Sequence, residues 1–182
     1  MRTVLITALL LAGAPSAMAD EHTGFYFGAG AGQINVEIPG FLPGVPFDES
    51  ANVWKGFAGW NFNENFALEG AYIDAESVDQ NFGSGIRATV DGEVLQLSAI
   101  GTYWFNDYLE LHGRVSADKY DSRTELTNGF VTLASNDDGT ELGFGGGIGA
   151  VWDRALFRLD YEQADLEDSE TRLVTLSIGW RF

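Results

Sequence analysis

The sequence predicts an all-β fold, an eight-stranded antiparallel up-and-down β-barrel that crosses a membrane. In eight segments apolar residues alternate with small or charged ones, and such alternation gives each strand one apolar face. Short and long polar connections alternate between these segments, as in membrane barrels whose turns are tight at one end. The composition agrees, because the 182 residues include 23 Gly, 13 Phe, 6 Tyr and 5 Trp.

Charge and composition exclude several classes of protein. Ten basic residues stand against 27 acidic ones, and the net charge of −17 argues against a nucleic acid partner, because phosphate binding requires a basic surface. Without cysteine the chain has no disulfide, thiolate metal site or cysteine nucleophile. No apolar run reaches the about 18 residues that a membrane-spanning helix needs.

The first residues predict an export signal. A basic start at Arg2 precedes the apolar run Val4–Ala14, and Ala17-Met18-Ala19 fits the small-x-small rule for cleavage. The alternative for these residues is a short buried helix. We expect a cleaved signal peptide over 1–19 and a barrel domain over 20–182.

The last strand shows the alternation most clearly. From Leu173 to Phe182 every even position is apolar, whereas Leu173 is the only apolar residue at an odd position. Seven further segments have the same two faces. In chain order the expected strands are 25–32, 54–62, 66–72, 95–105, 109–117, 141–150, 157–162 and 173–182.

The apolar faces of these strands are rich in Phe, Tyr and Trp. Phe57 lies on the same face as Lys55, two residues away, and interrupts the alternation of the second strand. The opposite faces carry glycine and charge. The sixth strand sets four glycines on one face: Gly143, Gly145, Gly147 and Gly149.

Three connections are tight turns, at 63–65, 106–108 and 153–154. The other four are longer and polar, at about 36–51, 74–88, 119–140 and 164–171, and we expect them to be loops. Most acidic residues lie in these loops and their flanks, and Glu162 is counted with them.

The polar face predicts the interior of the barrel. Charges of both signs beside many glycines make a poor soluble exterior, but inside a narrow lumen they can pair while the glycines leave room. The alternative is a soluble ligand-binding barrel with its apolar face inside. The expected interior network consists of Lys55, Glu69, Glu110, His112, Arg114, Arg158 and Asp160, with Arg158 pairing with Glu69 or Asp160.

Aromatic residues of the apolar face gather near the tight turns. Such a belt is typical of the interface between lipid and water. The expected interface residues are Trp60, Phe62, Phe66, Tyr103, Phe105, Trp152 and Trp180.

The chain resembles the eight-stranded transmembrane domain of the outer-membrane protein A family. The resemblance lies in Phe25–Gly28, Gln96–Ala99, Arg158–Tyr161 and the final segment Val174–Phe182. It implies a lumen closed by ion pairs, with Glu69, Arg114 and Arg158 at positions like those of the family's interior charges. One interior acid of the family falls at Gly149, which departs from that pattern. The resemblance also implies periplasmic chaperones and a barrel assembly machinery that recognises Phe182, Trp180 and Ile178.

No residue pattern predicts catalysis, a cofactor or a metal. His112 is the one histidine within an expected strand, and Ser116 lies about 13 Å away along that strand, too far for a hydrogen bond. No loop has the spacing of a calcium-binding loop. A lipid A-modifying enzyme that uses His112 is the enzymatic alternative.

We therefore expect a non-enzymatic protein of the Gram-negative outer membrane with a structural or surface-interaction role. Its partners would be the lipid bilayer, lipopolysaccharide and a surface or host ligand at the acidic loops. Divalent cations bridging these acids to lipopolysaccharide phosphates are a sharper version of that role. The main alternative is a narrow channel for ions or small solutes.

Overall fold

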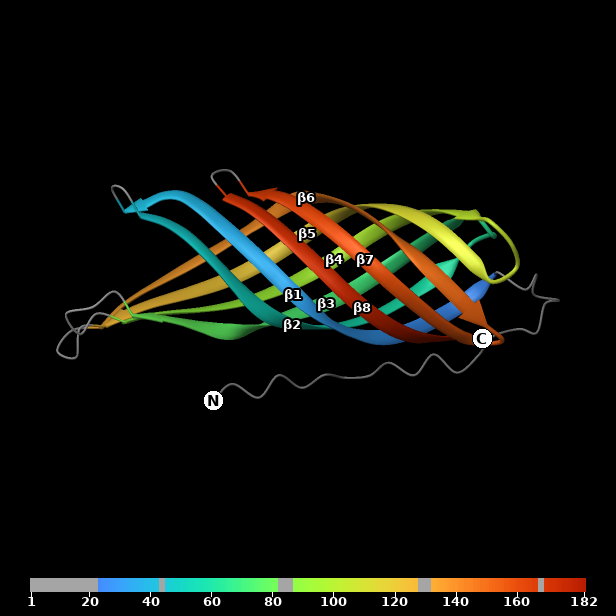
Figure 1. Ribbon diagram of the computed structural model, residues 1–182, viewed down its shortest axis with the longest axis horizontal. Helices are drawn as coiled ribbons and strands as arrows, with labels where there is room; N and C mark the ends of the chain where they lie inside the picture. The colour runs from blue at the N-terminus through green and yellow to red at the C-terminus, as the bar shows by residue number, and fades with distance from the viewer. Residues whose placement is uncertain (1–22, 43–44, 82–86, 128–131, 167–168) are drawn as a thin grey trace.

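The computed structural model describes residues 23–42, 45–81, 87–127, 132–166 and 169–182. Within these ranges the chain forms eight antiparallel strands that close into a barrel, which confirms the predicted fold (Figure 1). The predicted signal peptide lies outside the described residues. The strands are β1 (Gly24–Leu42), β2 (Val45–Asn61), β3 (Phe66–Asn81), β4 (Arg87–Trp104), β5 (Leu109–Thr127), β6 (Thr132–Trp152), β7 (Ala155–Leu166) and β8 (Ser169–Arg181).

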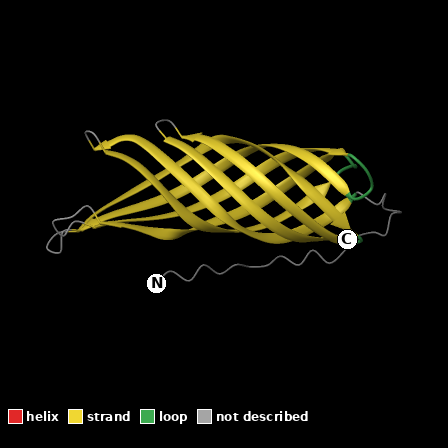
Figure 2. Ribbon diagram, in the orientation of Figure 1, coloured by secondary structure: helices red, strands yellow, loops and turns green. Residues whose placement is uncertain are grey.

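Each strand pairs with the next along the chain, and β1 pairs with β8 to close the cylinder. The described residues contain no helix of a length and hydropathy suited to crossing a membrane. The turns drawn as loops in Figure 2 all lie at the end of the barrel where the C-terminus is.

Side-chain chemistry explains the three tight turns. The Asn63 Oδ1 accepts hydrogen bonds from the backbone N–H groups of Asn65 and Phe66, both at 2.9 Å. Asn106 repeats this arrangement after β4, at 2.9 and 2.8 Å. Asp153 adopts a left-handed φ of 56°, which Asp tolerates better than most residues and which suits a two-residue turn. The predicted tight turns are confirmed.

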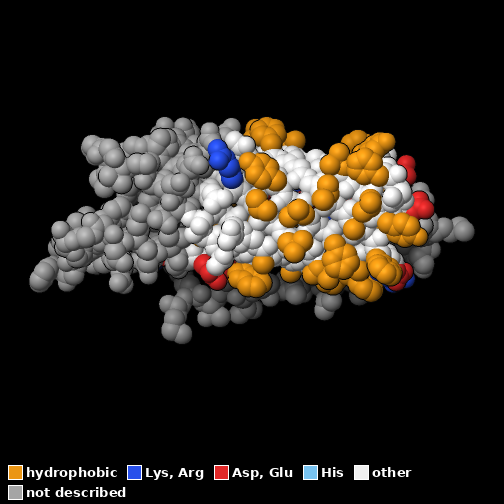
Figure 3. Space-filling view, viewed as in Figure 1, with side chains coloured by type: hydrophobic (Ala, Val, Ile, Leu, Met, Phe, Trp, Pro, Cys, Tyr) orange, Lys and Arg blue, Asp and Glu red, His pale blue; other side chains and the backbone are white. Residues whose placement is uncertain are grey.

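The strands turn their apolar face outward. Leu176 is 66% exposed and Trp152 81%, whereas the inward Lys55 on β2 is 3% exposed. Figure 3 shows apolar side chains over the described part of this face of the barrel, with charged side chains at the two ends of the apolar surface. A soluble barrel would have the opposite arrangement.

The prediction of four long loops was wrong, because the strands continue through most of these segments. The β1–β2 pairing extends to Leu42 and Val45, and the β5–β6 pairing extends to Thr127 and Thr132. Where water lies on both faces of a hairpin, a polar sequence can pair as a sheet without alternation. The alternation of apolar and polar residues therefore identifies the part of each strand that faces the membrane. It does not identify the part of the strand that extends beyond the membrane into water.

The barrel opens at the end opposite the tight turns. Among the described residues the β2–β3 pairing stops at Val53 and Ala75, and the β6–β7 pairing stops at Gly143 and Ala164. Beyond these pairs β7, β8, β1 and β2 form one sheet and β3 to β6 another, and the two groups diverge in Figure 1.

Candidate functional site

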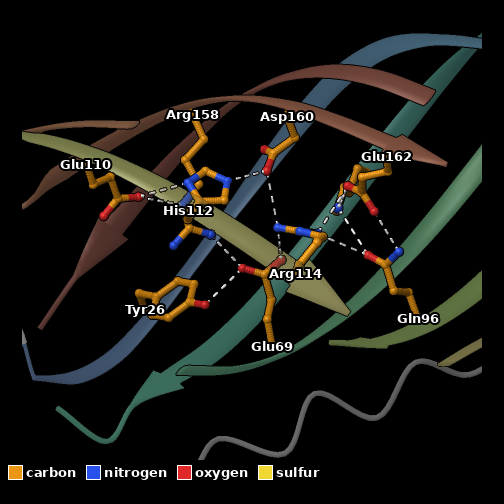
Figure 4. A network of polar contacts seen from close by, with 10 residues as sticks. Tyr26, Glu69, Gln96, Glu110, His112, Arg114, Arg158, Asp160 and Glu162 are labelled. Carbon is orange, nitrogen blue, oxygen red and sulfur yellow. Dashed lines mark hydrogen bonds and ion pairs between the residues drawn. The ribbon is translucent and has the colours of Figure 1, made fainter. Parts of the chain in front are cut away.

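The interior of the barrel brings together charged residues from four strands, β2, β3, β5 and β7 (Figure 4). The structure places all the predicted interior charges there, each 5% exposed or less: Lys55, Glu69, Glu110, His112, Arg114, Arg158 and Asp160.

Glu69 on β3 is the point where four strands meet. Its Oε2 accepts hydrogen bonds from Arg158 Nη1 of β7 at 2.7 Å and from the Tyr26 hydroxyl of β1 at 2.9 Å. Its Oε1 accepts one from Arg114 Nη2 of β5 at 3.2 Å. The Arg158 guanidinium also lies over the Tyr26 ring, 5.0 Å from its centroid. Tyr26 belongs to this network, although the sequence analysis did not single it out.

The predicted pairing of Arg158 with Glu69 is confirmed, and Arg158 has a second partner that the sequence did not indicate. Its Nε donates to Glu110 Oε1 at 3.3 Å, so Arg158 joins Glu69 with Glu110 rather than with Asp160. The Asp160 carboxylate instead accepts from Arg114 at 3.3 Å and lies 2.8 Å from His112 Nε2. Asp160 lies two residues beyond Arg158 on the same strand face, about 7 Å further along the strand. The two side chains therefore contact different partners.

Glu162, at the flank of the last predicted loop and on the polar face of its strand, also belongs to the interior. Lys55 Nζ lies 2.6 Å from Glu162 Oε1, and Gln96 Nε2 donates to Oε2 at 2.7 Å. Arg114 Nη1 donates to Oε1 at 3.1 Å. The signal was present in the sequence, because Glu162 shares the strand face of Arg158 and Asp160, and Gln96 lies on the polar face of β4.

His112 lies between two carboxylates. Its Nδ1 is 3.6 Å from Glu110 Oε1, on the side opposite Asp160. Ser116 donates its hydroxyl to Asp118 at 3.0 Å, so it is not paired with the imidazole. Among the described residues no group of three or more His, Asp or Glu side chains is placed to hold a metal ion.

Glycines on β6 provide the space for this network. A methyl group on Gly149 would lie 2.5 Å from Glu110 Oε1, and one on Gly147 would lie 2.8 Å from His112 Nε2. Glu110 is the cross-strand neighbour of Gly149. An acid from β5 therefore occupies the space beside Gly149.

Apolar side chains lie on both sides of the charged layer. On β2, Lys55 falls between Phe57, in an apolar cluster towards the tight turns, and Val53, in a second cluster towards the open end. The first cluster also contains Tyr26, Ala67, Ala71, Ile100, Val151 and Leu156. The second contains Ile73 and Leu173, with Ile34, Ala75 and Val94 packed against them. Phe57 and Leu173, which break the alternation, are thus interior residues.

A row of acids crosses the outer surface towards the open end. Asp74 on β3 is paired with Glu93 on β4, which is paired with Asp121 on β5, and that residue with Asp138 on β6. All four side chains are exposed. Like charges directly opposite each other in a sheet destabilise it.

The predicted interface aromatics all point outward near the tight turns. Their exposure ranges from 44% at Trp180 to 81% at Trp152. Phe182 packs its ring 5.9 Å from that of Phe25 and 5.7 Å from that of Phe27, and its backbone N–H donates to the Phe25 carbonyl at 3.0 Å.

The sequence model of the family described as outer membrane protein beta-barrel domain matches residues 4–182. No curated protein matches the chain in sequence.

Several solved structures have the same fold. The Neisserial surface protein A barrel is similar with a TM-score of 0.67 at 13% identity, over 87% of this chain and 97% of that one. A second similar structure is Ail, the attachment invasion locus protein of Yersinia pestis, in complex with the heparin analogue sucrose octasulfate. Its TM-score is 0.62 at 15% identity, over 87% of this chain and 99% of that one. The N-terminal β-barrel domain of Pseudomonas aeruginosa OprF has a TM-score of 0.52 at 15% identity, over 85% and 97%.

Proposed function

Because the chain belongs to the outer membrane protein beta-barrel family, we propose that it is a non-enzymatic surface protein of the outer membrane, acting through its acidic open end. The acidic row Asp74–Glu93–Asp121–Asp138 carries this proposal. The tight turns of such barrels face the periplasm, which directs the open end to the outside of the cell.

The charge of the acidic row defines the partner. Ail is described in complex with a sulfated sugar, which is a polyanion. A net charge of −17 and four opposed carboxylates repel such a ligand here. The proposed partner is cationic, either a basic surface of a host or bacterial molecule or a divalent cation shared with lipopolysaccharide phosphates.

Substitution of the whole row tests this role. Replacing Asp74, Glu93, Asp121 and Asp138 with Asn or Gln should weaken the binding of a polylysine probe. It should also weaken the Ca²⁺-dependent binding of lipopolysaccharide, while a sulfated polysaccharide should bind neither protein. The matched control replaces Glu64 and Asp107, exposed acids of the tight turns at the other end. Equal loss in the control, or no loss in the row variant, contradicts the proposal.

The interior supports a closed lumen. An eight-stranded barrel has space for little more than its own side chains, and the charged layer lies between two apolar clusters. We therefore place the narrow-channel function second. Planar bilayer recordings should show no steady conductance steps, and reproducible steps at neutral pH would favour the channel.

The polar interior groups also support a role without catalysis. His112 faces Asp160 and Glu110, and Ser116 is hydrogen-bonded to Asp118. Incubation with lipid A should leave its acyl chains intact, and deacylation that disappears in His112→Ala would support the enzymatic alternative instead.

Export and assembly complete the proposal. The signal peptide over 1–19 and recognition of Phe182, Trp180 and Ile178 by the assembly machinery remain predictions. The packing of Phe182 on Phe25 joins the ends of β1 and β8, where the barrel closes. Replacing Phe182 with Ala should slow assembly in cells more than it destabilises the assembled barrel.

A further inference from the structure

The outer surface carries an apolar groove across β4, β5 and β6, near the tight turns. It is shallow and open, with a volume of about 670 Å³. Its floor follows the sheet register, because Gly101, Gly113 and Gly146 are direct cross-strand neighbours. The same row continues to Phe66 on β3 and Tyr161 on β7, which close its two ends.

Packing within the barrel does not explain the glycines at two of these positions. A methyl group on Gly101 would meet nothing within 4 Å, and one on Gly113 would only touch the Gly145 carbonyl at 3.9 Å. The glycines of the lumen are different, since a methyl group at Gly147 or Gly149 would overlap its neighbours. Outward glycines weaken a strand, and where they line a groove they leave room for another molecule to approach the backbone.

The groove is shaped for a chain. Tyr103 and Leu111, a cross-strand pair, form one wall. Val115 and Phe144, paired across β5 and β6, stand in the row on the other side of the glycines. Each of these rows is two residues from the floor, about 7 Å along the strand, so the trough admits one hydrocarbon chain between flanking side chains.

The groove also has a direction. Phe66 is the first residue of β3 and lies next to the polar turn at Asn65, whereas Tyr161 lies six residues beyond the start of β7 at Ala155. The groove thus begins at the level of the tight turns and climbs towards the middle of the bilayer. It is continuous with the apolar surface that contacts lipid, and its concave floor does not match a second convex barrel.

From this geometry we propose that the groove holds one acyl chain of a glycerophospholipid from the leaflet next to the tight turns. The headgroup lies at the level of Asn65, and the chain runs over Gly101, Gly113 and Gly146 to Tyr161. This site is independent of the surface role proposed for the open end.

Filling the groove tests the site. The protein and the double variant Gly101→Leu, Gly113→Leu are reconstituted in vesicles of phosphatidylethanolamine, phosphatidylglycerol and lipid A, extracted in detergent, and examined by native mass spectrometry. The unsubstituted barrel should retain one phospholipid, and the variant should lose it, because the leucine side chains fill the space that the acyl chain would occupy. Gly56→Leu and Gly70→Leu are matched controls, because both glycines face outward with open space around them, and both should retain the lipid.

A second measurement needs no variant. A phospholipid with a spin label on its acyl chain should broaden the amide resonance of Gly113 more than that of Gly70. Equal broadening, or equal retention by filled and unfilled barrels, overturns the proposal. Retention of lipid A in place of phospholipid, or a dimer that the leucines abolish, overturns it as well.

Discussion

Arg158 of β7 and Glu69 of β3 meet across the lumen, with 2.7 Å between Nη1 and Oε2. The two residues are 89 positions apart, and their strands stand on opposite sides of the eight-stranded ring. Both side chains are buried, so their attraction is weakly screened while their desolvation is costly. This pair couples two strands that share no backbone hydrogen bond.

Removal of Arg158 should be the most damaging change to the interior. Arg158→Ala leaves Glu69 and Glu110 without their shared guanidinium, and an uncompensated buried charge costs about 3–5 kcal/mol. The free energy of unfolding in urea, measured in lipid vesicles, gives the effect. Arg154→Ala, at an exposed turn arginine, is the control and should be neutral. A similar stability of both variants would show that the network contributes little.

A charge on the apolar face should disrupt insertion in a manner that depends on depth. Leu97 on β4 is 55% exposed in the middle of the apolar surface, and Leu97→Arg should cost about 2–4 kcal/mol or prevent assembly. Phe62→Arg, at a tight turn, should cost only about 0–1 kcal/mol because arginine there reaches water. The migration of boiled and unboiled samples on a denaturing gel reports folding. Normal insertion of Leu97→Arg would contradict the assignment of the lipid-facing side.

The two kinds of glycine should respond oppositely to alanine. Gly149→Ala places a methyl group 2.5 Å from Glu110 Oε1, so it should destabilise the barrel or displace that side chain. Gly70→Ala faces open space and should be neutral or stabilise by about 0.5–1 kcal/mol, because glycine loses more chain entropy on folding. Urea titration of both variants measures the difference. The same response at both positions would mean that interior crowding is not the reason for the β6 glycines.

Loss of either turn asparagine should have a moderate effect. The Asn63 side chain accepts two backbone hydrogen bonds, and so does Asn106, each bond contributing about 0.5–1.5 kcal/mol. Asn63→Ala and Asn106→Ala should each lower the free energy of unfolding, and Asn63→Asp should restore most of it. Asp107→Ala, in the turn beside Asn106, serves as the control with little change. Equal effects of all these substitutions would contradict the role of the amide oxygens.

The alternation of residues was sufficient for the architecture of the membrane-embedded part. It identified the strands, the tight turns and the side that faces lipid, because these depend on neighbours in sequence and on the period of a strand. It failed for the ends of the strands, because polar hairpins in water have no apolar face to reveal them.

The pairing of charges could not be obtained in the same way. Seven interior charges allow many combinations, and which of them touch depends on strand register and on which strands face each other across the barrel. The link between Arg158 and Glu110, the position of His112 between two acids, and the bond between Lys55 and Glu162 all arise from that geometry.

By itself, the sequence determined a barrel with lipid outside and ions inside, since side-chain direction in a strand is a local property. Only the tertiary structure decided which residues from distant strands lie side by side. The row of four acids and the trough over Gly101, Gly113 and Gly146 exist because register aligns single residues of neighbouring strands. A shift of one residue in any of these pairings would turn the aligned side chains to the opposite face, and both surfaces would be lost.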